Sequence, residues 1–179
     1  MNKARGLCVL DVDGTLIEEE VIDLLGKEAG CEKEVAQLTA QAMRGELDFE
    51  SSLKKRVSQL KGLSIDAFDK IYHELHLSEN AVQFIKTLKE SQIEVGLVSG
   101  GFTIIVEKLA KEFGIPLFVA NQLEISDGHL TGNLIGPVIS REVKEETLVS
   151  WANRLEVPLE CTIAIGDGAN DLKMLKRAG

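Results

Sequence analysis

Three short apolar runs, each followed at once by a polar loop rich in aspartate or glycine, constrain the fold of this chain more than any other feature. The runs are Gly6 to Leu10, Ile93 to Val98 and Cys161 to Ile165, and the loops after them are Asp11 to Thr15, Ser99 to Gly101 and Gly166 to Asp171. Such runs are typical of strands buried in a parallel sheet, and a helical pattern follows each loop. The sequence therefore predicts an α/β fold with a doubly wound, mostly parallel sheet.

The segment between the first two runs is far longer than a single crossover helix requires. It holds about eighty residues and carries repeated helical signals without strand alternation. The helices expected there are Glu20 to Gly30, Cys31 to Arg44, and a third that runs from the N-cap residue Asp48 to about Leu60. These signals predict a helical cap subdomain at residues 18–76, inserted into an α/β core formed by residues 1–17 and 77–179.

The remaining core segments also carry local signals. A helix capped by Ser78 is expected to run to about Ser91, and another from Phe102 to Phe113. Asp127 and Gly128 lie between two short apolar segments and predict a hairpin.

Aspartates dominate the first and the third of the three loops. The carboxyl ends of strands in a doubly wound sheet face one ligand site, so Asp11 and Asp13 should meet Asp167 and Asp171 there. Each pair of carboxylates about 4 Å apart would cost on the order of 4 kcal/mol at an effective dielectric near 20. A divalent cation removes this cost, and oxygen ligands with room for water and phosphate suit Mg²⁺. Two carboxylates two residues apart also suit a nucleophile and a proton carrier.

Two further features suit an anion. The N–H groups of Ser99, Gly100 and Gly101 precede a helix and can hold a negatively charged group, to which the Ser99 hydroxyl adds a donor. Lys144 lies near the start of a helix that Ser140 is expected to cap, where a cation opposes the helix macrodipole. Taken singly, the glycines also fit a tight connection, and Lys144 also fits a solvated partner of neighbouring glutamates.

The net charge of the chain limits its partners. The 20 Lys and Arg against 29 Asp and Glu give −9, which repels nucleic acid and anionic membrane surfaces at long range. A phosphorylated substrate is compatible with this charge only where a metal or a few basic groups reverse the local field. No apolar stretch approaches the roughly 18 residues of a membrane span. The apolar run within Met1 to Leu10 is too short for a secretory signal. We therefore expect a cytoplasmic protein that binds neither nucleic acid nor membrane.

In their order and on these strand ends, the DxDGT loop, the SGG loop, the later lysine and the GDGAND loop resemble the four motifs of the haloacid dehalogenase superfamily of phosphohydrolases. The resemblance covers nearly the whole chain and implies a Rossmann-like core with an inserted cap. It implies that Asp11 is the nucleophile that becomes an aspartyl-phosphate, and that Asp13 protonates the leaving oxygen and then activates water. The other implied roles are Mg²⁺ binding by Asp11, the Asp13 backbone carbonyl and Asp167, phosphate binding by Ser99, Gly100, Lys144 and Asn170, and orientation of a metal-bound water by Asp171.

Within the cap, the resemblance narrows to the members of this superfamily that hydrolyse phosphoserine. Glu20, Met43, Phe49 and Arg56 look like their substrate pocket. Phosphoserine carries an ammonium and a carboxylate, which an acidic and a basic group can pair with, and arginine does so as a bidentate fork. The resemblance therefore implies phosphoserine as the small-molecule substrate and a role in making serine.

The end of the sequence departs from the pattern of this superfamily. The core of its members usually continues through another strand and helix, whereas this sequence stops at Gly179. We therefore expect the C-terminal part of the core to be missing. An exposed sheet edge promotes association, so a homodimer is among the expected states, and the sequence leaves the oligomeric state open.

Three alternatives share parts of this pattern. One is another phosphatase or phosphotransferase of the same superfamily that acts on a different small metabolite, and Glu20 together with Arg56 argues against it. A second is a receiver-like phosphoacceptor, which the long cap and Asp13 disfavour. The third is an inactive protein that binds an amino acid.

Overall fold

The sheet of this protein is built around its first strand. The computed structural model describes residues 4–44 and 46–179, except the side chain of Met43. Within these residues, five strands pair in the order β4-β3-β2-β1-β5. Their bounds are β1 Gly6–Leu10, β2 Ile93–Phe102, β3 Leu117–Ser126, β4 His129–Ile135 and β5 Thr162–Ile165. β1 pairs in parallel with β2 and β5, and β2 pairs in parallel with β3, so the predicted mostly parallel sheet is confirmed.

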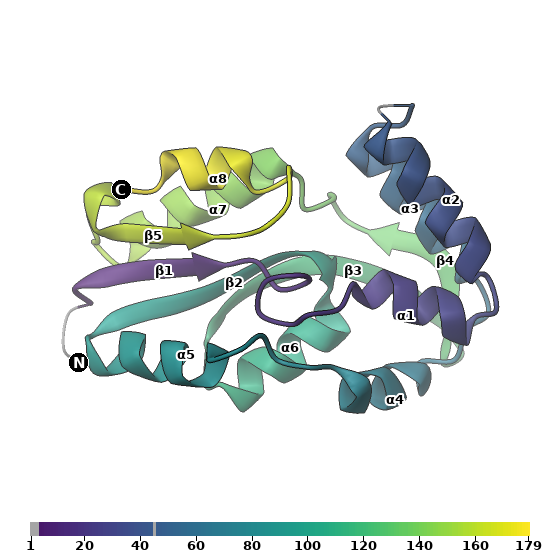
Figure 1. Cartoon of the computed structure of the whole chain (residues 1–179), viewed down its shortest axis with the longest axis horizontal. Coiled ribbons are helices and arrows are strands. Elements are labelled where there is room, and N and C mark those ends of the chain that lie inside the picture. Colours follow the sequence, from purple (N-terminus) through teal and green to yellow (C-terminus); the bar gives the residue numbers. More distant parts are fainter. Residues whose placement is uncertain (1–3, 45) are drawn as a thin grey trace.

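Helices cover both faces of the sheet (Figure 1). One layer contains α5 (Ala81–Glu90) and α6 (Thr103–Glu112), and the other contains α7 (Arg141–Arg154) and α8 (Leu172–Arg177). The side chains of β1 alternate between two apolar clusters. Cys8 and Leu10 pack in the cluster that includes α5 and α6 residues, whereas Leu7 and Val9 pack in the cluster that includes α7 and α8 residues. Burial on both faces explains why this strand reads as a continuous apolar run.

Four helices between β1 and β2 occupy one end of the molecule (Figure 1). They are α1 (Val21–Glu28), α2 (Glu32–Met43), α3 (Phe49–Gln59) and α4 (Ala67–Glu74), and we call them the cap helices. The first three lie where the sequence predicts helices, and Asp48 caps α3, because its Oδ1 accepts a hydrogen bond of 2.9 Å from the Ser51 N–H. The sequence analysis did not predict α4. No helix in the described ranges is long and apolar enough to cross a membrane.

The β3–β4 hairpin joins the cap helices to the sheet. Its predicted turn is confirmed at Asp127 and Gly128, whose φ angles of 50° and 75° are typical of a tight hairpin. The segment after α3 runs along β4: the Gly62 N–H donates to the Leu130 carbonyl, and the Leu130 N–H donates to the Leu63 carbonyl. One end of α3 is therefore held on the core by main-chain hydrogen bonds.

The predicted start of α5 is wrong by a few residues. The residue before the helix is Asn80, and Ser78 does not cap it. Instead, the Ser78 hydroxyl donates a hydrogen bond of 2.6 Å to the Thr15 carbonyl, and its N–H donates to the Leu16 carbonyl. Ser78 therefore ties the chain returning from the cap helices to the loop after β1, a contact between segments far apart in the sequence.

Candidate active site

Asp11 lies at the end of the central strand and is held by main-chain and side-chain contacts. Its N–H donates to the carbonyl of Ile165 at the end of β5, so the pairing of β1 with β5 continues to this residue. Its Oδ1 accepts a hydrogen bond of 2.8 Å from the Val12 N–H and lies 2.9 Å from the Lys144 Nζ. Burial raises the pKa of Asp11 to about 7, although the charge of Lys144 opposes this rise.

Lys144 is a fully buried cation. It lies in the first turn of α7, whose N-cap Ser140 accepts a hydrogen bond from the Val143 N–H as predicted. The Lys144 Nζ lies 2.9 Å from Asp11 and 2.6 Å from Asp171, and its side chain has no exposed surface. The alternative that Lys144 is a solvated partner of neighbouring glutamates is therefore wrong. A buried charge is tolerated only when it is paired, which accounts for its two carboxylate partners.

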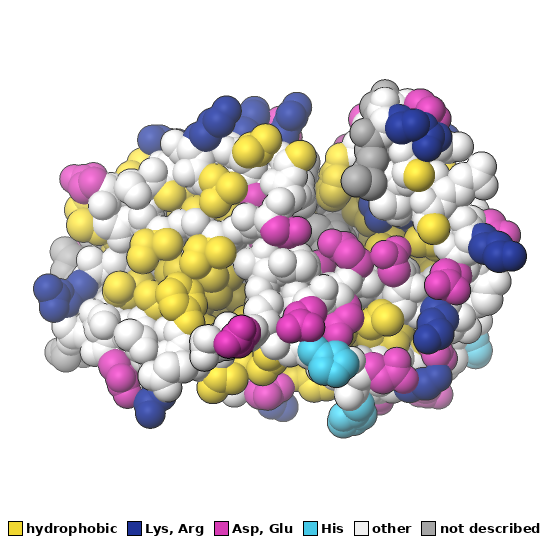
Figure 2. Space-filling view, viewed as in Figure 1, with side chains coloured by type: hydrophobic (Ala, Val, Ile, Leu, Met, Phe, Trp, Pro, Cys, Tyr) yellow, Lys and Arg dark blue, Asp and Glu magenta, His cyan; other side chains and the backbone are white. Residues whose placement is uncertain are grey.

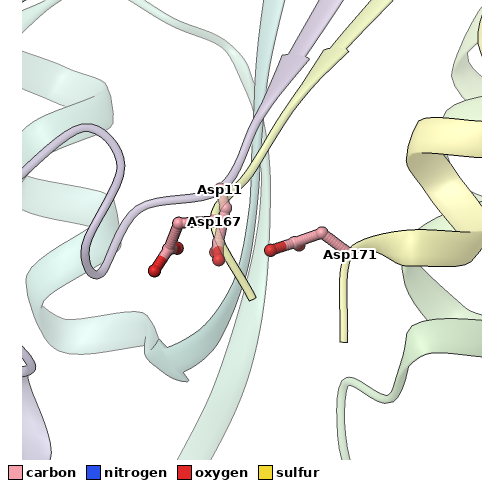
Figure 3. A group of neighbouring side chains, drawn as sticks. All are labelled: Asp11, Asp167 and Asp171. Atoms are coloured by element: carbon pink, nitrogen blue, oxygen red, sulfur yellow. The ribbon is translucent and has the colours of Figure 1, made fainter. Parts of the chain in front are cut away.

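Three aspartates from separate positions in the chain surround one point. Asp11 follows β1, Asp167 lies in the loop after β5, and Asp171 precedes α8. Figure 3 shows the side chain of Asp171 pointing toward Asp11, with Asp167 beside Asp11. Each offers a carboxylate oxygen, and these oxygens lie within 4.8 Å of one another. Such a set of hard oxygen donors fits a divalent cation.

The turn of the first loop brings it close to Asp167. Gly14 has a φ of 70°, and a Cβ at this position would lie 2.8 Å from an oxygen of Asp167. Thr15 fixes the same carboxylate from its other side, because its hydroxyl donates a hydrogen bond of 3.1 Å to Asp167 Oδ1. Close packing at Gly14 thus allows the first and third loops to meet.

Asp13 is a buried carboxyl group with few hydrogen-bond partners. Its Oδ2 accepts a hydrogen bond of 3.0 Å from the Val21 N–H, and its Oδ1 is buried without a partner among the described residues. Burial, together with the negative charge of Glu20, raises the pKa of Asp13 to about 8. Both effects favour the protonated form of this side chain, which suits a group that gives a proton to a substrate.

The predicted loop at Ser99 to Gly101 is the last part of β2. The pairing of β2 with β3 changes register between Val98 and Phe102, which marks an irregularity at this stretch. Ser99 is fully buried, and its Oγ accepts a hydrogen bond of 2.8 Å from the Gly101 N–H. Because the oxygen acts as an acceptor there, the hydroxyl hydrogen is directed elsewhere, and a phosphate oxygen is an acceptor that fits.

A cavity of about 150 Å³ joins the strand ends to the cap helices. The predicted site residues that line it are Asp11, Asp13, Glu20, Phe49, Arg56, Gly100, Asp167 and Asn170. Ser99, Lys144 and Asp171 are buried and do not line it. The sequence analysis did not single out Ile22 and Leu53, which also line it, because their apolar periodicity only indicates a buried helix face.

A second cavity, of about 640 Å³, shares Phe49, Arg56 and Asn170 with the first. It lies between α2 and α3 on one side and the start of α7 on the other. Figure 2 shows a notch between the lobe of α2 and α3 and the body of the molecule. This cavity therefore offers a route from solvent to the smaller cavity.

Arg56 and Glu20 carry opposite charge into the small cavity. The Arg56 guanidinium donates a hydrogen bond of 3.5 Å to the Thr39 hydroxyl, and its buried Nε has no partner among the described residues. Burial lowers the pKa of Arg56, while Asp23 and Glu20 oppose that change. The sequence analysis missed Asp23, which lies in the first turn of α1, three residues after the N-cap Glu20, a spacing that brings the two side chains to the same side. The side chain of Met43, also predicted to line the pocket, lies outside the described residues.

Comparisons with known proteins agree on one family. The sequence model of a family described as haloacid dehalogenase-like hydrolase matches residues 8–176. A phosphoserine phosphatase of Streptococcus thermophilus is 50% identical over 179 residues, which cover 100% of this chain and 83% of that protein. One from Lactococcus lactis is 49% identical over 176 residues, which cover 98% of this chain and 82% of that protein. A solved structure of a phosphoserine phosphatase with a phospho-aspartyl intermediate analogue has a TM-score of 0.92 and 44% identity, over 99% of this chain and 85% of the other.

Proposed function

The chain belongs to the haloacid dehalogenase-like hydrolase family, and we propose that it is a phosphatase that hydrolyses O-phospho-L-serine to L-serine and phosphate. The reaction passes through an aspartyl-phosphate on Asp11 and completes the synthesis of serine. Relatives about half identical over the whole chain carry this activity in their names, and another solved neighbour with 43% identity is a substrate-bound phosphoserine phosphatase complex.

One observation carries this proposal: a single cavity contains both the aspartates of the first loop and the charged pair of the cap helices. Asp11 and Asp13 line it from the loop after β1, while Glu20, just before α1, and Arg56 of α3 line it from the cap helices. A phosphoserine whose phosphate lies at Asp11 can therefore extend its ammonium toward Glu20 and its carboxylate toward Arg56. A volume of about 150 Å³ suits a small metabolite.

In the first step, the Asp11 carboxylate attacks phosphorus. Val12 and Lys144 both contact Oδ1, which leaves Oδ2 as the attacking atom. The Oδ2–P bond forms while the bond between phosphorus and the serine oxygen breaks. Asp13 gives its proton to that oxygen, and its raised pKa of about 8 suits a general acid at neutral pH.

In the second step, water replaces Asp11 on phosphorus. Asp13, now ionised, takes a proton from the water, whose oxygen forms a bond to phosphorus as the bond to Asp11 breaks. Phosphate leaves, and Asp11 and Asp13 return to their starting states. Ser99, Gly100, Lys144 and Asn170 hold the phosphoryl oxygens through both steps, because charge on these oxygens must be offset throughout.

We propose Mg²⁺ as the metal, held by Asp11, Asp167 and the Asp13 backbone carbonyl, with Asp171 orienting a water. The three clustered aspartates support a divalent cation at this point. When bound, the ion supplies positive charge that offsets the carboxylates and the phosphate. Of the proposed carboxylate ligands, Asp11 also contacts Lys144 in the described residues, so its negative charge is partly offset by the lysine as well.

The substrate is recognised by the cap helices in this proposal. Glu20 pairs with the ammonium of phosphoserine. Arg56 donates two hydrogen bonds to the carboxylate, one from its unpaired Nε and one from a terminal nitrogen. Phe49, which lines the cavity, excludes water from the site during transfer. We also propose the division into a core of residues 1–17 and 77–179 and a cap of residues 18–76, a location in the cytoplasm, and a homodimer as one state to be tested.

The test is phosphate release from L-phosphoserine and from p-nitrophenyl phosphate, each with Mg²⁺ and with EDTA. We expect a higher kcat/KM for phosphoserine that EDTA abolishes. Mg²⁺-dependent activity on the aryl phosphate alone would keep the chemistry and discard the substrate. Activity that persists in EDTA would discard the metal, and inactivity on both substrates would favour a binding role.

A further inference from the structure

Asn121 of β3 is a buried amide that connects two elements of the active site. The residue is 2% exposed, and among the described residues it does not line the small cavity beside Asp11. Its Nδ2 donates a hydrogen bond of 2.7 Å to the Gly100 carbonyl, and its Oδ1 accepts one of 2.8 Å from the Ile139 N–H. Both ends of one side chain are thus committed to the main chain of two different segments.

The first contact fixes the peptide unit beside Ser99. The Gly100 carbonyl and the Gly101 N–H belong to one planar peptide unit, so fixing one group fixes the other. Asn121 holds the carbonyl, and Ser99 Oγ accepts from the N–H at 2.8 Å. The register change in β2 removes this stretch from regular pairing with β3. Asn121 therefore supplies the hydrogen bond that the sheet does not, and it orients the Ser99 hydroxyl through the shared peptide unit.

The second contact fixes the start of α7. Ile139 precedes Ser140, which caps the helix by accepting from the Val143 N–H. The Ser140 carbonyl also accepts a hydrogen bond of 2.9 Å from the Lys144 N–H. The position of residue 139 thus sets where the first turn of α7 begins and where the Lys144 ammonium reaches Asp11.

We propose that Asn121 is a positioning residue that sets the spacing between Ser99 and Lys144, the two groups that hold phosphate from opposite elements. The inference rests on the proposed function, because it concerns the phosphate site of that reaction. Among the described residues, the side chain of Asn121 hydrogen-bonds to Gly100 and Ile139 and to none of the cap helices, so its loss should affect every phosphomonoester alike. In this respect it differs from Arg56, whose loss should affect only substrates with a carboxylate.

Two variants test the proposal. Asn121→Ala removes both hydrogen bonds, whereas Asn121→Asp keeps an acceptor for the Ile139 N–H and, when ionised, loses the donor to Gly100. With Mg²⁺ present, we expect kcat/KM to fall about tenfold or more on both phosphoserine and p-nitrophenyl phosphate. Inhibition by inorganic phosphate should weaken by a similar factor. Asn133→Ala is the matched control, because Asn133 is an exposed amide on the same hairpin and should leave all three quantities unchanged.

The outcomes separate positioning from a structural role alone. Folded variants with unchanged phosphate inhibition and turnover would overturn the proposal, and so would a loss confined to phosphoserine. If circular dichroism shows that neither variant folds, the side-chain amide signals of Asn121 in the unaltered protein decide the matter. They should shift when inorganic phosphate is added with Mg²⁺, and signals that do not move would overturn the proposal. If the unaltered protein cleaves only p-nitrophenyl phosphate, phosphoserine is rejected as the substrate. The role of Asn121 is then tested by the same measurements on p-nitrophenyl phosphate.

Discussion

Arg56 brings a buried guanidinium edge to the cavity with one hydrogen-bonding position unused. Its Nε lacks a partner among the described residues, while its terminal nitrogen contacts Thr39. An unpaired buried donor is unfavourable in the free protein. A substrate carboxylate would accept a hydrogen bond from this donor, so the unfavourable free energy of the unpaired donor is removed only when a substrate with a carboxylate binds.

Replacing this side chain should therefore separate substrate choice from chemistry. Arg56→Ala should cost about 2 kcal/mol, roughly thirtyfold in kcat/KM, on phosphoserine, and should leave p-nitrophenyl phosphate nearly unaffected. Lys54→Ala is the control, since Lys54 is an exposed cation on the same helix that pairs with Glu50. Equal losses on the two substrates would remove Arg56 from substrate recognition.

Asp11 is the proposed nucleophile of the reaction. Asp11→Asn should abolish turnover of both substrates, because an amide is a poor nucleophile toward phosphorus. The far-UV circular dichroism spectrum should stay unchanged, since Lys144 retains Asp171 as an ion-pair partner. Asp127→Asn, in the exposed hairpin turn, serves as the control. Appreciable residual turnover would place the nucleophile elsewhere.

At the scale of elements, the contact between β2 and α7 leaves no free volume. A Cβ built on Gly96 would lie 2.3 Å from a ring carbon of Trp151. Overpacking of this kind costs about 1–3 kcal/mol because neighbouring atoms must shift. The glycine therefore sets how closely α7, which carries Lys144, approaches the sheet.

Gly96→Ala should accordingly lower the free energy of unfolding by about 1–3 kcal/mol. Urea unfolding can be followed by fluorescence, because Trp151 is the single tryptophan of the chain. Circular dichroism provides a second probe that does not depend on that residue. Gly96→Ala should cost less unfolding free energy in the Trp151→Leu variant, followed by circular dichroism, than in the unaltered protein. If the cost is the same in both proteins, the close contact with Trp151 does not explain the destabilisation.

At the scale of the whole molecule, the site gathers carboxylates from several segments. Protons and a metal ion should compete for these carboxylates, so the stability of the folded protein should depend on both pH and metal. In the metal-free protein, burial raises the pKa of Asp13 to about 8 and that of Asp11 to about 7, from 3.8. Because the folded values exceed the unfolded ones, these groups contribute stability that is fully present below pH 3.8 and is lost as the pH rises through 7 to 8.

The melting temperature in EDTA should thus fall between pH 6 and pH 9, by roughly several degrees. The rise in Tm on adding Mg²⁺ should be larger at pH 9, since the ion binds the ionised carboxylates and stabilises only the folded state. Differential scanning calorimetry at both pH values measures both trends. Asp13→Asn should flatten the slope in EDTA, and a larger Mg²⁺ effect at pH 6 would contradict the linkage.

Local patterns in the sequence were sufficient for most of the fold. Continuous apolar runs predicted β1, β2 and β5, and the cap of α3 at Asp48 and that of α7 at Ser140 were predicted from side-chain chemistry. The hairpin at Asp127 and Gly128 was predicted from turn residues. These features depend on neighbours within a few residues, which is why a single sequence reveals them. The short α4 was missed, and the start of α5 was predicted incorrectly because Ser78 donates to the distant Thr15 carbonyl and does not cap the helix.

The sequence by itself determined which chemical groups are present and in which loops they lie, because parallel strands place their carboxyl ends together. Only the tertiary structure decided that Lys144 is buried between Asp11 and Asp171 and that Asp23 faces the same region as Arg56. The role of Asn121 also emerged only there, since its partners Gly100 and Ile139 lie 21 and 18 residues away. Burial and hydrogen bonding between distant segments depend on how the whole chain packs, and no local pattern in the sequence encodes them.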